Sequence, residues 1–235
     1  MSWDAETYDR VADPQEAWAR EILQRAPFAA GQTVLDAGCG TGRVTELLLE
    51  RGLRVIAVDS DAAMVAKARE RLSGRARVER QDLLELALGE PVDAIFSCAV
   101  FHWISDHERL FERLHAALRP GGRLVAQCGG HGNLANVIRA MREQSPRHHV
   151  ATPEDARRHF ATPEDTERRL RGAGFAEARA WLEPRPTTVA DPDGFAAAVC
   201  LHGHPDGREL APKVVAQLGD PPMFDYVRLN IEAVA

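Results

Sequence analysis

The sequence lacks any apolar run long enough to cross a membrane. No stretch of its 235 residues approaches the roughly 20 consecutive apolar residues that a membrane-spanning helix needs. Residues 1–10 carry charges of both signs and lack the basic-then-apolar order of a secretion signal. We therefore expect a soluble, cytoplasmic protein without a membrane partner.

Closely spaced cysteines and an excess of basic residues are lacking as well. The cysteines stand far apart, at Cys39, Cys98, Cys128 and Cys200, without the close spacing of a zinc site or a redox pair. We expect reduced thiols and no metal site. The net charge of −6 disfavours a nucleic-acid partner, because binding to a polyanion depends on Lys and Arg neutralising phosphates. A small-molecule partner is the class that remains.

Short apolar segments alternate with helical patterns through the first half of the chain. Strands are expected at residues 33–37, 54–58, 76–80, 94–98 and 123–127, with helices between them at 44–50, 62–72, 83–87 and 106–118. Such alternation predicts a parallel sheet with helices on both faces. Two closing strands are expected at 175–182 and 226–233. The carboxyl ends of the parallel strands then share one edge, where ligands collect.

The length suits a single domain, residues 1–235, with insertions. An N-terminal segment, 1–30, contains a helical pattern at 15–25. The alternation of expected strands and helices stops after Gln127, and the two closing strands are separated by another irregular segment. We expect insertions at 129–160 and 184–223 that cap the ligand edge of the sheet.

A glycine-rich turn follows the first expected strand. Residues 36–42 read Asp-Ala-Gly-Cys-Gly-Thr-Gly, so the backbone can turn sharply and a ligand can approach it closely. The spacing is Gly-x-Gly-x-Gly, because Arg43 stands where the dinucleotide pattern has its last glycine. This departure disfavours a nicotinamide- or flavin-dependent oxidoreductase.

Acidic residues close the next two strands. Asp59 ends the second strand and can accept hydrogen bonds from both hydroxyls of a ribose. Asp82 follows the third and can accept one from an adenine amino group. A lone acid at a strand end is usually only solvated. Three motifs at successive strand ends instead favour a nucleoside-containing cofactor.

Together these motifs resemble those of class I S-adenosylmethionine-dependent methyltransferases over most of the chain. The resemblance implies a doubly wound, mostly parallel seven-stranded α/β sheet with an antiparallel last strand. It also implies S-adenosylmethionine as cofactor and S-adenosylhomocysteine as product. The residues it assigns to the cofactor are Gly38 and Gly40 at the amino-acid portion, Asp36 orienting the turn, Asp59 at the ribose, Ser60 and Met64 beside the adenosine, Asp82 and Leu83 at the adenine, Cys98, and Tyr8 in an N-terminal flap.

The segment after the fourth strand holds the candidate catalytic pair, His102 and Trp103. Methyl transfer from a sulfonium is a direct displacement, which mainly requires an aligned nucleophile and a dry site. His102 can act as a base or, when neutral, donate to a carboxylate, while the Trp103 indole can only donate. The pair resembles the loop of trans-aconitate and juvenile hormone acid methyltransferases, which implies O-methylation of a carboxylate.

Several alternatives stay open. The acceptor atom can be an oxygen, nitrogen or carbon of a natural-product-like small molecule, with His102 as base. The chain can also be a non-catalytic, regulatory S-adenosylmethionine-binding protein. In a purely structural interpretation, Trp103 packs the top of the core and His102 caps a helix that begins at Ser105 or Asp106.

Overall fold

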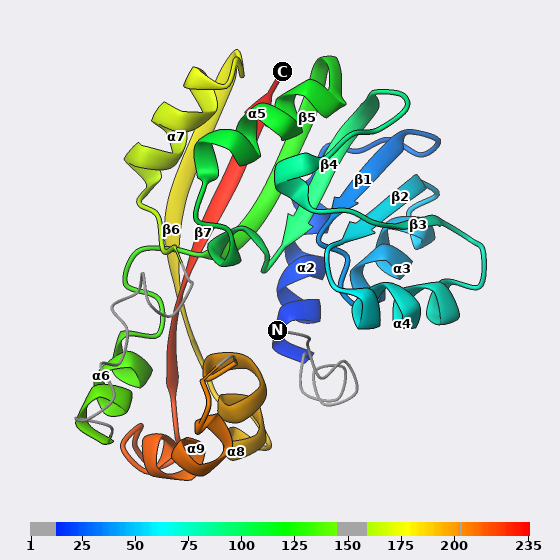
Figure 1. The fold of residues 1–235 in the computed structure, drawn as a ribbon. Coiled ribbons are helices and arrows are strands. Elements are labelled where there is room, and N and C mark those ends of the chain that lie inside the picture. Colours follow the sequence, from blue (N-terminus) through cyan, green and yellow to red (C-terminus); the bar gives the residue numbers. More distant parts are fainter. Residues whose placement is uncertain (1–12, 145–158, 203) are drawn as a thin grey trace.

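A seven-stranded sheet forms the centre of the fold (Figure 1). The computed structural model describes residues 13–144, 159–202 and 204–235. The strands are β1 (Thr33–Ala37), β2 (Arg54–Asp59), β3 (Arg77–Arg80), β4 (Val92–Cys98), β5 (Leu118–Gly129), β6 (Glu177–Thr187) and β7 (Phe224–Val234). Their order is β3-β2-β1-β4-β5-β7-β6. The strands β1 to β5 pair in parallel, and β7 runs antiparallel to both of its neighbours, which confirms the predicted fold.

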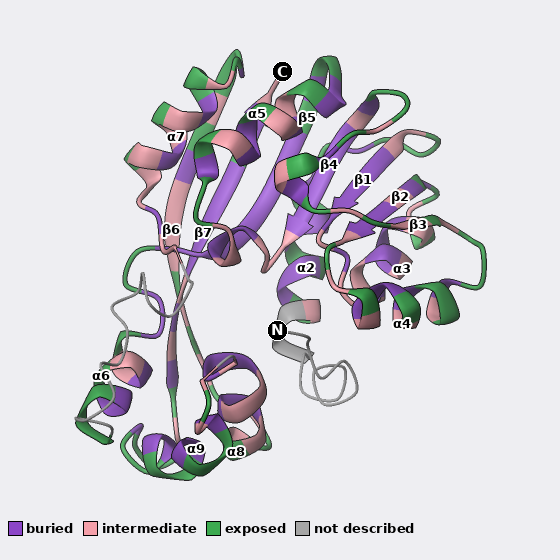
Figure 2. Cartoon of the chain, in the orientation of Figure 1, coloured by how far each residue is buried: buried purple, intermediate pink, exposed green. Residues whose placement is uncertain are grey.

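Helices cover both faces of this sheet. The helices α2 (Asp13–Arg25), α3 (Arg43–Glu50) and α4 (Ala62–Leu72) share an apolar cluster with one face. The helices α5 (His107–Ala117) and α7 (Pro163–Gly172) share another with the opposite face. Neighbouring strand residues point to opposite faces, so Val34 belongs to the first cluster and Leu35 to the second. Figure 2 shows the central strands buried between these layers.

The strands β6 and β7 continue beyond the sheet as a two-stranded ribbon (Figure 1). The strand β5 pairs with β7 only from Arg228 onward, whereas β6 pairs with it from Phe224. At its far end the ribbon carries a lobe made of α6 (Ala135–Gln144), α8 (Pro192–Phe195), the π-helical η3 (Ala196–Cys200) and α9 (Gly207–Val215). These helices bury their own apolar cluster, which includes Met141, Phe195, Val214 and Phe224. The two sequence segments expected as insertions thus meet in one lobe.

Several element boundaries differ from the prediction. The expected insertion at 184–223 begins too early, because β6 extends through Pro184 and Pro186 to Thr187. Prolines discourage a strand, but β6 is an edge strand, where a missing N–H is tolerated. The helix expected at 83–87 is one 3-10 turn, η1 (Leu83–Glu85). No helix within 13–144, 159–202 and 204–235 is long and apolar enough to span a membrane.

Candidate active site

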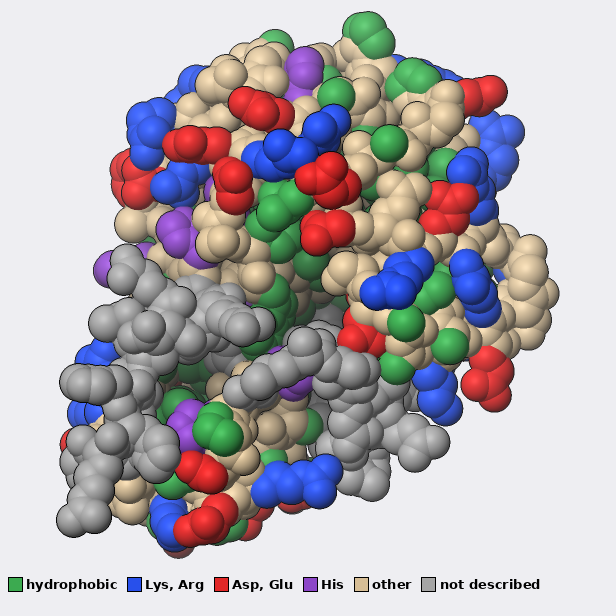
Figure 3. Space-filling model, viewed as in Figure 1, with side chains coloured by type: hydrophobic (Ala, Val, Ile, Leu, Met, Phe, Trp, Pro, Cys, Tyr) green, Lys and Arg blue, Asp and Glu red, His purple; other side chains and the backbone are tan. Residues whose placement is uncertain are grey.

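A cavity of about 330 Å³ lies where the carboxyl ends of the parallel strands face the lobe. On the face shown in Figure 3, hydrophobic side chains line the hollow between the lobe and the rest of the molecule. The predicted site residues that line it are Gly38, Gly40, Asp59, Ser60, Met64, Asp82, Leu83, Cys98, His102 and Trp103. Asp36 is not among its lining residues, and Tyr8 lies outside the described part of the chain.

The glycine turn is fixed to β2 and open toward the cavity. The N–H groups of Gly38 and Cys39 both donate to the Val58 carbonyl, at 2.9 Å each. Gly38 and Gly40 have φ values of +83° and +54°, which side chains rarely adopt. A Cβ on Gly38 would lie 2.4 Å from Val100 Cγ2, whereas a Cβ on Gly40 would meet nothing within 4 Å. Gly40 therefore leaves bare backbone at the cavity wall.

Asp59 braces this turn as well as lining the cavity. Its Oδ2 accepts from the N–H of Gly40 and its Oδ1 from the N–H of Asp61, both at 2.9 Å. Burial raises the pKa of the carboxyl, and these backbone hydrogen bonds oppose the rise. Each oxygen of a carboxylate can accept more than one hydrogen bond. Asp59 can thus hold the turn and still accept from a ligand hydroxyl.

Asp36 lies behind the turn rather than in the cavity. It is 1% exposed, and its Oδ2 accepts from Thr45 Oγ1 at 2.6 Å. Burial raises its pKa to about 7, while the Thr45 hydrogen bond opposes the rise. The carboxyl joins β1 to α3 directly beneath the glycines, so it supports the turn from the core side.

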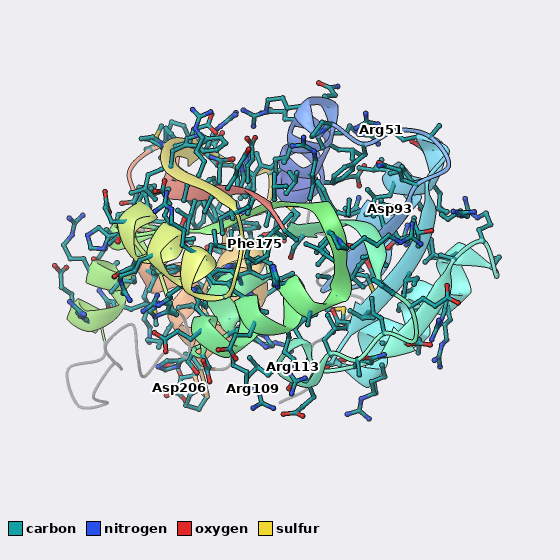
Figure 4. The ribbon with its side chains drawn as sticks, turned by 90° about the horizontal axis from the view of Figure 1, so that it is seen from above. Arg51, Asp93, Arg109, Arg113, Phe175 and Asp206 are labelled. Atoms are coloured by element: carbon teal, nitrogen blue, oxygen red, sulfur yellow. The ribbon has the colours of Figure 1, made fainter. Side chains whose placement is uncertain are left out.

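The third strand end is also built to hold its position. Asp82 Oδ1 accepts from the Leu84 N–H at 2.9 Å and caps η1, and Leu83 is buried beside it. Arg109, labelled in Figure 4, reaches from α5 to the Leu84 carbonyl at 2.8 Å and to Glu85 at 2.6 Å. This arginine fixes the loop that carries Asp82 against the body of the protein.

His102 lies in the 3-10 turn η2 (Phe101–Trp103), at the end of β4. Its side chain is buried, with a relative exposure of 8%, and its ring stacks on Phe160 at 6.0 Å. Its Nδ1 accepts a hydrogen bond from the Gly129 N–H at 3.3 Å. A neutral imidazole that accepts at Nδ1 carries its proton on Nε2. The fold thereby selects the tautomer that donates through Nε2.

The purely structural interpretation of this loop is wrong for His102. The helix α5 is capped by Asp106, whose side chain accepts from the Arg109 N–H at 2.9 Å. Trp103 is half-buried at the cavity, with its ring 5.1 Å from the His102 ring. Its ring also meets the His202 ring edge-on at 5.7 Å. The indole thus connects the candidate catalytic loop to the lobe through its contact with His202.

Several cavity residues were missed by the sequence reasoning. They come from the lobe and from β7, and they are Leu134, Val199, Tyr226 and Arg228. Asn133, in the loop after β5, also lines the cavity, whereas the nearby His131 is exposed. The period-2 pattern of polar residues at Tyr226, Arg228 and Asn230 is a signal that could have indicated a polar strand face.

Behind η2, a buried histidine predicts acid sensitivity. His107 is 2% exposed and bonds the Phe101 carbonyl through Nε2 at 2.9 Å, and burial lowers its pKa to about 4. The unfolded chain, with a pKa near 6.5, then binds the extra proton first as the pH falls. We expect the folded state to lose about 3 kcal/mol from this residue between pH 6.5 and pH 4.

Denaturant unfolding at pH 7, 5.5 and 4 measures this effect against a His107→Gln variant, whose amide can still donate to Phe101. Asp36 shifts stability in the opposite direction over this range, because its folded pKa is raised. Only the difference between the two proteins therefore reports on His107. Parallel stability curves for both proteins would contradict the prediction.

Comparisons with known proteins agree with this geometry. Residues 34–122 match a family model described as a methyltransferase domain. A trans-aconitate 2-methyltransferase of Methylobacterium nodulans is 35% identical over 189 residues, which cover 80% of this chain and 69% of that relative. The same enzyme of Rhizobium etli is 42% identical over 129 residues, which cover 54% of this chain. The chain spans about half the length of that second relative, 50%.

Solved structures share the fold at low identity. The YcgJ protein of Bacillus subtilis has a TM-score of 0.68 at 16% identity, covering 92% of this chain and 97% of that one. Phosphoethanolamine N-methyltransferase 2 of Haemonchus contortus, in complex with S-adenosylhomocysteine, has a TM-score of 0.64 at 22% identity. That match covers 93% of this chain and 52% of the other.

The sheet order, the open glycine turn and the acids at two further strand ends are typical of α/β proteins that bind a nucleoside-containing cofactor. The matches to the methyltransferase domain and to the Methylobacterium relative narrow this class of protein to the methyltransferases. The chain belongs to the S-adenosylmethionine-dependent methyltransferase family.

Proposed function

We propose that this protein methylates a carboxylate oxygen of a small organic acid, with S-adenosylmethionine as the methyl donor. The observation that carries the proposal is the hydrogen bond from the Gly129 N–H to His102 Nδ1, which makes the neutral ring a donor through Nε2. The relatives named trans-aconitate 2-methyltransferase support the same acceptor chemistry.

The residues on the cofactor side of the cavity fit this donor. Gly40 offers bare backbone, and Asp59 and Asp82 offer carboxylate oxygens at the two following strand ends. When bound, S-adenosylmethionine supplies an electrophilic methyl group on a sulfonium. We assign Gly38, Gly40, Asp59, Ser60, Met64, Asp82, Leu83 and Cys98 to its binding, while Asp36 supports the turn and the role of Tyr8 stays a prediction.

The acceptor side suits an anion that is already deprotonated. A carboxylate at neutral pH needs no base, so the protein has to hold it in line with the methyl group and keep water out. The Nε2–H of His102 and the indole N–H of Trp103 are the donors we assign to this task. An alcohol acceptor would instead need a free ring nitrogen to take its proton, and Nδ1 already accepts from Gly129.

Transfer of a labelled methyl group to a panel of mono-, di- and tricarboxylic acids, with trans-aconitate included, tests the proposal. We expect a product whose label is released as methanol by mild alkali, because a methyl ester hydrolyses and N-methyl, C-methyl and ether products do not. An alkali-stable product from a hydroxyl, amine or carbon acceptor would overturn it. Calorimetry with S-adenosylhomocysteine and NAD separates the other two classes of protein. A protein that binds S-adenosylhomocysteine and methylates no acceptor would be regulatory, and one that binds NAD preferentially would be an oxidoreductase.

A further inference from the structure

Arg228 is a buried cation with unused hydrogen-bonding capacity at the cavity. It is 1% exposed and yet lines the cavity. Its Nε donates to Gln127 Oε1 at 3.1 Å, and its buried Nη2 has no hydrogen-bond partner among the residues that the structure describes. A guanidinium that leaves water without a counter-ion costs several kcal/mol. Such a group is stabilised when an oxyanion ligand completes its hydrogen bonds.

The surroundings of Arg228 fix its orientation without neutralising its charge. Its Cζ lies 4.6 Å from the centre of the Trp18 ring, in a cation–π contact. Gln127 accepts from Arg228 and donates through Nε2 to Asn230 Oδ1 at 2.8 Å, so its amide can present only the oxygen to the arginine. Next along this chain of hydrogen bonds, Asn230 donates to Glu183 at 3.3 Å.

The nearby acid already has a cation of its own. Glu183 forms an ion pair with Arg185 at 2.8 Å, and Arg185 also pairs with Glu21 at 2.7 Å. Within residues 13–144, 159–202 and 204–235, no Asp or Glu forms an ion pair with Arg228. The positive charge therefore acts on the ends of β4 and β5. There, burial raises the pKa of Cys98 to about 11 and of Cys128 to about 12, and Arg228 opposes both rises.

The position of Arg228 points to the acceptor rather than the cofactor. Arg228 is in register with Gly129, the residue whose N–H bonds His102 Nδ1. The strand β7 lies two strands beyond β4, roughly 10 Å at the usual strand spacing, on the side away from the glycine turn. The cavity residue next to it on β7 is Tyr226, which packs in the apolar cluster of the lobe.

We infer that Arg228 binds a second carboxylate of the acceptor, one that is not methylated, and thereby orients the acceptor beside His102. This inference rests on the proposed function, because it takes the acceptor to be an acid. The guanidinium offers parallel N–H donors that match a carboxylate in a way that an ammonium cannot. Arg228 is thus a specificity-determining residue for acids with more than one carboxylate.

Binding measurements test the inference without turnover. The protein is saturated with S-adenosylhomocysteine, which carries no methyl group to transfer, and titrated calorimetrically with trans-aconitate. In Arg228→Met, which keeps the apolar packing on Trp18, we expect the Kd for trans-aconitate to rise about 30-fold, as for the loss of a charge-assisted hydrogen bond. The Kd for S-adenosylhomocysteine should stay within about twofold, which also shows that the variant is folded.

Arg179→Met is the matched control, because it removes one positive charge from β6 outside the cavity lining and outside the hydrogen-bond chain that reaches Arg228. It should leave both dissociation constants nearly unchanged. If Arg228→Met fails to bind S-adenosylhomocysteine because it is unfolded, Arg228→Lys replaces it, with an expected rise of about tenfold for trans-aconitate.

Other outcomes separate the failure of this inference from the failure of the proposed function. Equal trans-aconitate binding by wild type and a folded Arg228→Met variant overturns it, as does no binding by the wild type. A rise only in the Kd for S-adenosylhomocysteine would assign the arginine to the cofactor's own carboxylate. Loss of trans-aconitate binding in the variant, in a protein that methylates no acid, would sustain the carboxylate site while the proposed function fails.

Discussion

Gly40→Ala is expected to weaken S-adenosylhomocysteine binding about 100-fold, or about 2.7 kcal/mol, while the protein stays folded. A Cβ at this position meets no protein atom within 4 Å, so it projects into the space that we assign to the cofactor. The φ of +54° adds a strain of about 1 kcal/mol for alanine, which a stable domain tolerates. Calorimetry gives the dissociation constant, and denaturant unfolding gives the stability.

Two further glycines separate the causes of this effect. Gly31→Ala introduces the same kind of strain, at a φ of +83° and with nothing within 4 Å, just before β1 begins and outside the cavity lining. It should cost stability and leave binding unchanged. Gly38→Ala would press a Cβ against Val100 at 2.4 Å, so we expect it to destabilise the fold by about 3 kcal/mol. Equal binding by the Gly31 and Gly40 variants would remove Gly40 from the cofactor site.

His102→Asn is expected to lower kcat about 100-fold with little change in affinity for S-adenosylhomocysteine. An asparagine oxygen can replace Nδ1 as the acceptor for the Gly129 N–H, but the side chain has nothing at the position of Nε2. His102→Gln makes the opposite change, because its amide reaches the position of Nε2 and can donate there. A donor to an anionic oxygen is worth roughly 1.5–3 kcal/mol, so glutamine should restore most of the lost rate.

The pair of His102 variants also decides between a donor and a base. Glutamine cannot accept a proton at neutral pH, so activity in His102→Gln is incompatible with an obligatory base. If both variants lose activity equally, and wild-type kcat rises with pH through the range of an imidazole, His102 acts as the base. That result would favour a hydroxyl or amine acceptor over a carboxylate.

The meeting of the residues that we assign to the cofactor around one cavity could be predicted, because their sequence signals are local. The glycine turn and the strand-end acids Asp59 and Asp82 each follow an expected strand within one or two residues. Parallel pairing then brings successive strand ends to one edge whatever the details of the loops. The close approach of Val100 to Gly38 could not be foreseen, although the glycine spacing implied some close contact there.

The acceptor side could not be predicted because it depends on distant pairing. Arg228 reaches the cavity through the antiparallel register that places it opposite Gly129, far away in the sequence. The sequence pattern places Arg228 in the closing strand expected at 226–233. That pattern does not indicate which strand pairs with it. Pro184 and Pro186 hid the length of β6, since their tolerance depends on β6 being at the sheet edge. The orientation of His102 likewise depends on a backbone N–H from the neighbouring strand.

The ribbon formed by β6 and β7 joins the lobe to the part of the molecule that carries the residues assigned to the cofactor. The cavity residues assigned to the cofactor all fall within residues 34–122, the stretch that matches the methyltransferase domain, whereas Leu134, Val199, Tyr226 and Arg228 lie beyond it. The lobe has an apolar cluster of its own, so substitutions there need not disturb the packing around the donor site. Exchange of the lobe at the ribbon should therefore replace the cavity residues Leu134 and Val199, while His102, Trp103 and the residues assigned to the methyl donor stay in place.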